Sequence, residues 1–357
     1  MNQRRTLLAT LGALGAGGLT GGLTGGLTGG LTSSLPASAQ QADKQPDKKA
    51  DKIWRIGALY QSNAQTDEAR LAQRELPLAL RAAGYVEGKN LVIDWRFAEL
   101  KAASLKSIAE ELVRTRVDLI LTGNTTMTHA VQKATATLPI VMASSGDPVA
   151  SGFAKSLAKP GGNITGLSNL SAELGTKMLQ MLIEFTAKTN PKLSRVAVMI
   201  NPANSGNVAL LHNLEAAARI TRSKILPLEV GNQADLERAF ATITRERSEA
   251  LIVARDSVFN PLAKEIAGRA LQLRLPTASG GGAPAAAGIL MSIGPKRPDQ
   301  FARVAMYIDR IFKGAKPGDL PIEQPTLFQV IINGKTAKAL GLKIPQALLI
   351  SAERVIE

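Results

Sequence analysis

VDLILTGNTTMTHAVQKATATLPIVMASSG (residues 117–146) can be laid over EALIVARDSVFNPLAKEIAGRALQLRLPTASGGG (residues 249–282). Each stretch has a short apolar run, a polar turn, a helical pattern, a Leu-Pro pair and a loop of small residues. Short apolar strands that alternate with amphipathic helices indicate βαβ units and a parallel sheet covered on both faces. The repetition therefore predicts two similar α/β lobes in tandem.

The same alternation continues outward from these two stretches. Expected strands are 53–60, 90–97, 117–122, 138–144, 194–200, 224–230, 249–254, 275–279, 288–294 and 327–333. Expected helices are 67–85, 104–116, 125–135, 207–220, 234–247, 261–273, 298–314 and 335–342. A Pro-rich segment, 315–325, separates the last two strand and helix pairs. We expect the C-terminal part to complete both lobes, so that the chain crosses between them more than once and forms a hinge.

The first 39 residues are typical of an export signal. Arg4 and Arg5 precede a weakly apolar, Gly-rich run, and Ala37-x-Ala39 offers a cleavage site before Gln40. Twin arginines before such a run predict a cleavable twin-arginine (Tat) type signal peptide and a periplasmic protein. Residues 40–52 are polar and read as a disordered lead-in.

Composition narrows the class of protein. The chain has 357 residues, a formal charge of +14 and no cysteine. Thiol catalysis, disulfides, thiolate metal sites and a lipid-modified N-terminal cysteine are therefore excluded. The basic residues are scattered and are not interleaved with aromatics, so we expect no nucleic-acid partner.

Polar residues gather where the expected strands end. In open parallel sheets, ligands bind beyond the carboxyl ends of the strands. Short hydroxyls, amides and glycines in these loops suit a polar ligand held by neutral hydrogen bonds. The candidate ligand-binding residues are Ser62, Gly123, Asn124, Thr125, Ser144, Ser145 and Asp147 in the first lobe, and Asn201, Asp256 and Ser279 in the second.

Enzymatic motifs are scarce. Both histidines, His129 and His212, fall inside expected helices, and no nucleophile elbow, P-loop or metal-ligand spacing occurs. We therefore predict no catalytic residue, no metal and no cofactor. Arg255 and Asp256 are either a clasp for a zwitterion or a local structural pair. The alternative is a glycosyltransferase- or epimerase-like two-lobed enzyme that uses Asp147 and Asp256.

Several longer motifs then resemble one family. They are GYVEGKNLVIDWRFAE (84–99), LPIVMASSGDPVASGFAKSLAKPGGNITGLSNLS (138–171), LSRVAVMINPANS (193–205), GAKPGDLPIEQPTLFQVIINGKTAKALGLKIPQALL (314–349) and SAERVIE (351–357). Together they are similar to the ABC-transporter substrate-binding family that includes proposed tryptophan/tyrosine-binding proteins.

The resemblance implies a type I periplasmic binding protein fold, with two Rossmann-like lobes joined by three crossings near 166–168, 291–293 and 324–326. Lobe 1 would comprise 53–166 and 293–325, and lobe 2 would comprise 167–292 and 326–357. It also implies a monomer that closes on a small solute and delivers it to an inner-membrane ABC permease, without chemistry of its own. The resemblance also implies that the ten candidate ligand-binding residues named above line the cleft. A regulator with this fold would need an N-terminal helix-turn-helix, and an export signal stands in its place.

Two departures from the family bear on the ligand. The segment TASGGGAPAAAG (277–288) replaces a longer one with an aromatic, and Ile293 takes a tyrosine position in MSIG (291–294). A cleft without aromatics is a poor stacking surface, so a smaller or aliphatic solute is expected as readily as an aromatic one. For Asp147, two roles stay open: it caps the following turn or lines the rim, or it contacts a ligand amine.

Overall fold

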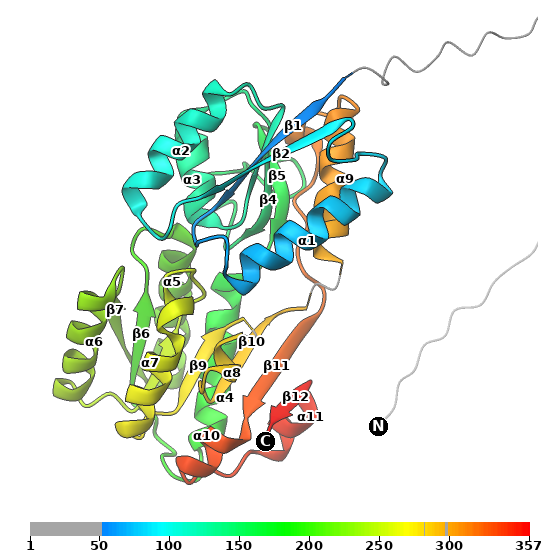
Figure 1. Ribbon diagram of the computed structural model, residues 1–357. Helices are drawn as coiled ribbons and strands as arrows, with labels where there is room; N and C mark the ends of the chain where they lie inside the picture. Colours follow the sequence, from blue (N-terminus) through cyan, green and yellow to red (C-terminus); the bar gives the residue numbers. More distant parts are fainter. Residues whose placement is uncertain (1–51, 282, 297–298) are drawn as a thin grey trace, which may run out of the picture. The chain divides into compact units, whose positions relative to one another are not determined.

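The computed structural model describes residues 52–281, 283–296 and 299–357, which form two α/β lobes (Figure 1). The predicted signal peptide and nearly all of the lead-in lie outside the described residues.

Lobe 1 is built on a five-stranded parallel sheet in the order β2-β1-β3-β4-β5. Its strands are β1 (Trp54–Tyr60), β2 (Leu91–Phe97), β3 (Leu119–Thr122), β4 (Ile140–Ser145) and β5 (Ile164–Ser168). Its helices are α1 (Asp67–Ala82), α2 (Ala102–Arg114), α3 (Thr125–Ala134) and α9 (Gln300–Phe312). Side chains of α1 and α9 form one apolar cluster with the sheet, and those of α2 and α3 form another, so both faces are covered (Figure 1).

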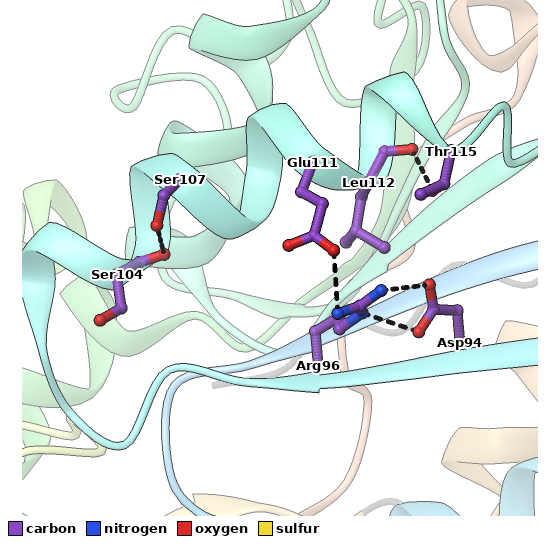
Figure 2. Close-up of polar contacts among 7 residues, drawn as sticks. All are labelled: Asp94, Arg96, Ser104, Ser107, Glu111, Leu112 and Thr115. Atoms are coloured by element: carbon purple, nitrogen blue, oxygen red, sulfur yellow. Dashed lines mark hydrogen bonds and ion pairs between the residues drawn. The ribbon is translucent and has the colours of Figure 1, made fainter.

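An ion-pair bridge holds α2 against the edge strand β2. Arg96 donates from Nε and Nη2 to the carboxylate of Asp94, at 2.7 and 3.1 Å, and its Nη1 lies 3.1 Å from Glu111 of α2 (Figure 2). On α2, Ser107 and Thr115 donate their hydroxyl protons to backbone carbonyls one turn earlier (Figure 2). The bridge fixes a helix on the outer strand, far along the sheet from β4 and β5.

Lobe 2 is built on a seven-stranded sheet in the order β12-β11-β10-β9-β8-β6-β7. Its strands are β6 (Arg195–Ile200), β7 (Lys224–Glu229), β8 (Ala250–Val253), β9 (Thr277–Gly280), β10 (Met291–Pro295), β11 (Phe328–Asn333) and β12 (Arg354–Ile356). Its helices are α4 (Ser171–Thr186), α5 (Ser205–Thr221), α6 (Gln233–Arg245), α7 (Phe259–Gln272), α8 (Ala283–Ala286), α10 (Gly334–Ala339) and α11 (Gln346–Ser351). The pairing is parallel except between β10 and β11, which run antiparallel because the chain enters β11 from the opposite end.

The sequence patterns did not reveal β5 and α4. Helix α4 is apolar around most of its circumference, with ten buried positions, and its N-cap residue Leu170 makes no side-chain capping bond. Neither amphipathic periodicity nor a capping residue therefore marks it. By contrast, α3 and α5 begin at the capping side chains of Asn124 and Asn204 and follow the predicted ranges closely.

The chain passes between the two sheets three times: between β5 and α4, between β10 and α9, and between 323 and β11. Strand β10 stays in the second sheet through Pro295, two residues past the boundary expected at 293. Gly166 precedes the first passage with φ of 128°, and a Cβ there would lie 2.3 Å from the carbonyl oxygen of Met142. Only glycine fits this position.

Candidate functional site

A cavity of about 330 Å³ lies where the carboxyl ends of strands from both sheets meet. Its walls are βα loops and the first turns of helices, as expected for open parallel sheets. The residues that line it are Tyr60, Asp67, Glu68, Leu71, Gly123, Asn124, Thr125, Ala143, Ser144, Gly146, Gln300 and Phe301 from lobe 1, and Asn169, Ser171, Asn204, Gly206, Asn207, Arg255, Asp256, Ser257, Asn260, Gly280, Gly281 and Pro284 from the rest of the chain.

The structure brings half of the predicted site residues to this cavity. They are Gly123, Asn124, Thr125, Ser144 and Asp256. The other five, Ser62, Ser145, Asp147, Asn201 and Ser279, do not line it.

Local structure explains why several of these residues face elsewhere. The Ser62 hydroxyl lies 3.0 Å from that of Thr66, which caps α1. Ser145 is fully buried behind Thr125, at 3.4 Å between hydroxyl oxygens. Ser279 points into a separate small cavity of about 20 Å³ beneath β9.

Asp147 has the role of a turn cap. Its Oδ1 accepts hydrogen bonds from the backbone N–H groups of Val149 at 3.1 Å and Ala150 at 2.9 Å. It borders an open groove on the outside of the lobes. It is therefore separated from Asp256, and the two acids that the enzyme alternative needs do not share one site.

Asp256 is buried and held by neighbours on its own lobe. Its carboxylate accepts from Asn204 Nδ2 at 2.7 Å, from Asn201 Nδ2 at 3.2 Å and from the backbone N–H of Val258 at 3.0 Å. Burial raises the pKa of this carboxyl, against the lowering effect of the three donors. Asp256 thus organises the floor of the cavity through these three donors, and in the described residues no ion pair joins it to Arg255, so the expected local Arg255-Asp256 pair does not form.

Three charged side chains in the wall lack such partners. Within the described part of the chain, the guanidinium of Arg255 and the carboxylates of Asp67 and Glu68 have no hydrogen bond or ion pair. Glu68 is exposed at the surface, yet the protein packed around it still raises its pKa by desolvation, while the charge of Arg255 lowers it and that of Asp256 raises it. The sequence prediction omitted Glu68. Its position in the first turn of a helix that follows a buried strand could have indicated that it reaches the site.

Aromatic side chains do reach the cavity, which corrects the expectation of a cleft without them. Tyr60 ends β1, and Phe301 begins α9, a helix that returns to lobe 1 from the far end of the chain. Burial, followed by the Glu68 charge, raises the pKa of Tyr60, so its phenol is neutral. Ile293 lies in the core of lobe 2, paired with Gly280 and Val330, and it is not part of the cavity wall.

The lobes touch directly along a line beside the cavity, which we call the seam: His129, Gly146 and Ser151 of lobe 1 against Ser205 and Gly206 of lobe 2. The Ser205 hydroxyl lies 2.7 Å from that of Ser151 and 3.0 Å from His129 Nε2. A Cβ on Gly146 would stand 3.0 Å from the Cα of Gly206. Nearby, Asn124 Nδ2 donates across to the Ser257 hydroxyl at 3.0 Å.

The described ranges contain no group of three or more His, Cys, Asp or Glu side chains placed to hold a metal ion. No helix in them is long and apolar enough to cross a membrane.

Two Rossmann-like lobes that share a cavity at their strand ends define the type I periplasmic binding fold. The family described as ABC transporter substrate binding protein matches residues 66–356, and the chain belongs to this family. The family's members are solute-binding proteins rather than enzymes.

Individual relatives are more distant. A tyrosine-binding protein of Clostridioides difficile is 24% identical over 265 residues, which cover 74% of this chain and 75% of that protein. A conserved domain protein of Vibrio cholerae has a similar structure, with a TM-score of 0.77 and 26% identity over 85% of this chain and 100% of that one. An ABC domain of Streptococcus pneumoniae in complex with L-Trp gives a TM-score of 0.75 at 23% identity, over 85% of this chain and 100% of that one.

Proposed function

We propose that this protein captures a small polar solute, an amino acid or a related organic molecule, by closing its two lobes, and delivers it to an inner-membrane ABC permease. The observation that carries the proposal is the cavity itself, since both lobes supply its walls and make only a few direct contacts around it. Rotation about the three chain passages would open or close such a space without disturbing either core.

The size and chemistry of the cavity suit an amino acid. Its volume of about 330 Å³ is at the small end of the range for ligand sites in proteins. Its wall carries the charges of Glu68 and Arg255 together with the apolar surfaces of Tyr60, Leu71 and Phe301. The named ligands of two relatives, tyrosine and L-Trp, combine charged and aromatic groups, and the two aromatic rings in the wall make an aromatic side chain acceptable here.

Ligand screening tests the proposal. Thermal-shift and calorimetric screens should cover the twenty L-amino acids, small organic acids and purines, and mass spectrometry of the denatured protein should identify what co-purifies. We expect saturable binding of at least one compound and no turnover of it. Absence of any ligand together with turnover of a substrate would contradict the proposal.

The export part of the proposal has its own test. Cleavage after Ala39 predicts a periplasmic form that begins at Gln40, which N-terminal sequencing of the periplasmic fraction can check. Replacing both Arg4 and Arg5 with Lys should retain the precursor in the cytoplasm if the Tat pathway exports it. Normal export of that variant would indicate the Sec pathway instead.

A further inference from the structure

Unpartnered charges of opposite sign face the cavity from opposite lobes. Glu68 and its neighbour Asp67 belong to the first turn of α1 in lobe 1, and Arg255 belongs to the loop between β8 and α7 in lobe 2. The influence of Arg255 lowers the pKa of Glu68, so their fields overlap, yet no ion pair joins them in the described structure. The space between them belongs to the cavity.

Many of the neighbouring polar groups are already engaged, although the described residues give no partner to the side chains of Asp67 and Asn260. Asp256 accepts three hydrogen bonds from its own lobe. Asn124 and Asn169 use their side-chain amides on Gln61, Ser257 and Ser144. Burying a charge without a partner is strongly unfavourable. A ligand that supplies a partner to both Glu68 and Arg255 therefore favours closure over the cavity.

We propose that Glu68 and Arg255 form a clasp for a zwitterion, in which Glu68 accepts hydrogen bonds from the ligand ammonium group and Arg255 donates to its carboxylate. This inference rests on the proposed function, and it assigns the ammonium to Glu68 rather than to its sequence candidate Asp256. Because the two charges sit on different lobes, one ligand headgroup bridges both, and binding is coupled to closure.

The clasp also predicts which ligands bind weakly. A carboxylic acid without an amine leaves Glu68 desolvated and unpaired, and an amine without a carboxylate leaves Arg255 in the same state. Hydrogen bonds to charged groups contribute about 1.5 to 3 kcal/mol each, so loss of either partner corresponds to roughly a 10- to 150-fold weaker Kd.

The first experiment uses three compounds built on one skeleton. The amino acid that binds most tightly in the screen of twenty is compared by calorimetry with its decarboxylated amine and its deaminated acid. We expect both analogues to bind the wild-type protein at least about 10-fold more weakly.

The second experiment tests which residue recognises which charged group of the ligand. In Glu68→Gln, the preference for the amino acid over its deaminated acid should shrink while the preference over the amine persists, and Arg255→Gln should show the reverse. Arg255→Lys should retain a measurable part of the preference over the amine, since it keeps the charge. Glu75→Gln, further along α1, and Arg245→Gln, exposed on α6, make the same charge changes outside the cavity and should leave both preferences intact.

The outcomes separate the two proposals. If an amino acid binds but neither substitution alters its preferences, the clasp is wrong and solute capture stands. If only organic acids or purines bind, the clasp is also wrong. If nothing binds, the proposed function itself fails.

Discussion

The seam and the cavity occupy the same level of the molecule, between the same two sets of strand ends, and their chemistry is opposite. Apart from His129, the seam consists of glycines and short hydroxyls, and its polar groups already bond to one another across the lobes, such as Ser151 and Ser205 at 2.7 Å. The cavity is bordered by long charged side chains that do not meet, Glu68 and Arg255. Where the lobes touch, their polar groups form hydrogen bonds with one another. At the cavity, the unpaired charged groups need a ligand as their partner.

The contact between the lobes at the seam can set the geometry of the cavity beside it. Contact at Gly146 and Gly206 brings two backbones together without side chains between them, which sets how closely the lobes approach. That approach in turn fixes the width of the cavity next to it. Gly146 and Gly206 also border the cavity, so changes at their contact should alter ligand affinity by changing how closely the lobes approach.

The largest effect should come from a wedge in the seam. Gly146→Val places a branched side chain against the Cα of Gly206, where even a Cβ would have only 3.0 Å. Overpacking of this kind costs about 2 to 3 kcal/mol, which would weaken the ligand Kd by roughly 30- to 150-fold through loss of the closed state. Calorimetry measures the affinity.

Gly162→Val is the matched control, because a Cβ at Gly162 meets no atom within 4 Å. It should bind ligand as the wild-type protein does. Equal affinity of Gly146→Val and Gly162→Val would show that the seam does not govern the cavity.

A smaller effect is expected from the cavity floor. Asp256→Asn replaces an acceptor of three hydrogen bonds by an amide whose NH₂ group must face a donor, and this should lower the free energy of unfolding by about 2 kcal/mol. Urea denaturation measures the change. Asp147→Asn, a turn cap that asparagine replaces well, should cost less than about 0.5 kcal/mol. Similar losses in the two variants would contradict the role given to Asp256.

The smallest effect concerns pH at the seam. Burial, together with the Lys133 charge, lowers the pKa of His129 below its ordinary 6.5, and Gln132 opposes this shift. The unfolded chain therefore binds the proton more readily, so the stabilisation is complete above pH 6.5 and is lost as the pH falls through the lowered value.

The charged and titratable groups that border the groove beside His129 are Asp147, His212 and Lys133. Unfolding of the wild-type protein and of His129→Gln should be compared between pH 7.5 and pH 5. We expect the wild-type protein to lose up to about 1 kcal/mol more than the variant over this range. Parallel curves of unfolding free energy against pH for the two proteins would show that His129 does not cause the pH dependence.

Much of the fold could be predicted because local patterns repeat. Strand and helix alternation, with asparagine caps at Asn124 and Asn204, specifies the βα units of both lobes and places their loops at one edge. Helix α4 escaped because it is apolar on most sides, and its burial between sheet and neighbouring helix replaces the usual signals.

The site was harder to predict for a related reason. Sequence order indicates which loops reach the strand ends, but not which way a side chain turns, so Ser145 and Asn201 point into the protein while Thr125 and Asp256 reach the cavity. Phe301 lies on α9, more than 130 residues along the chain from Gln61-Ser62 and the other lobe 1 loops. Only the tertiary fold brings it to the cavity. Pairing of charges across lobes likewise has no signature along the chain.

The central claim, that the lobes close on a zwitterion, can be tested most directly by a distance across the cavity. The chain has no cysteine, so Arg74→Cys on α1 and Lys264→Cys on α7 allow two spin labels to be attached at defined positions. Both helices begin at the cavity wall, and electron–electron double resonance can measure the distance between the labels with and without the tightest-binding amino acid. The account predicts a shorter mean distance and a narrower distribution when the amino acid is bound. An unchanged distribution at a concentration where calorimetry shows the site to be full would contradict it.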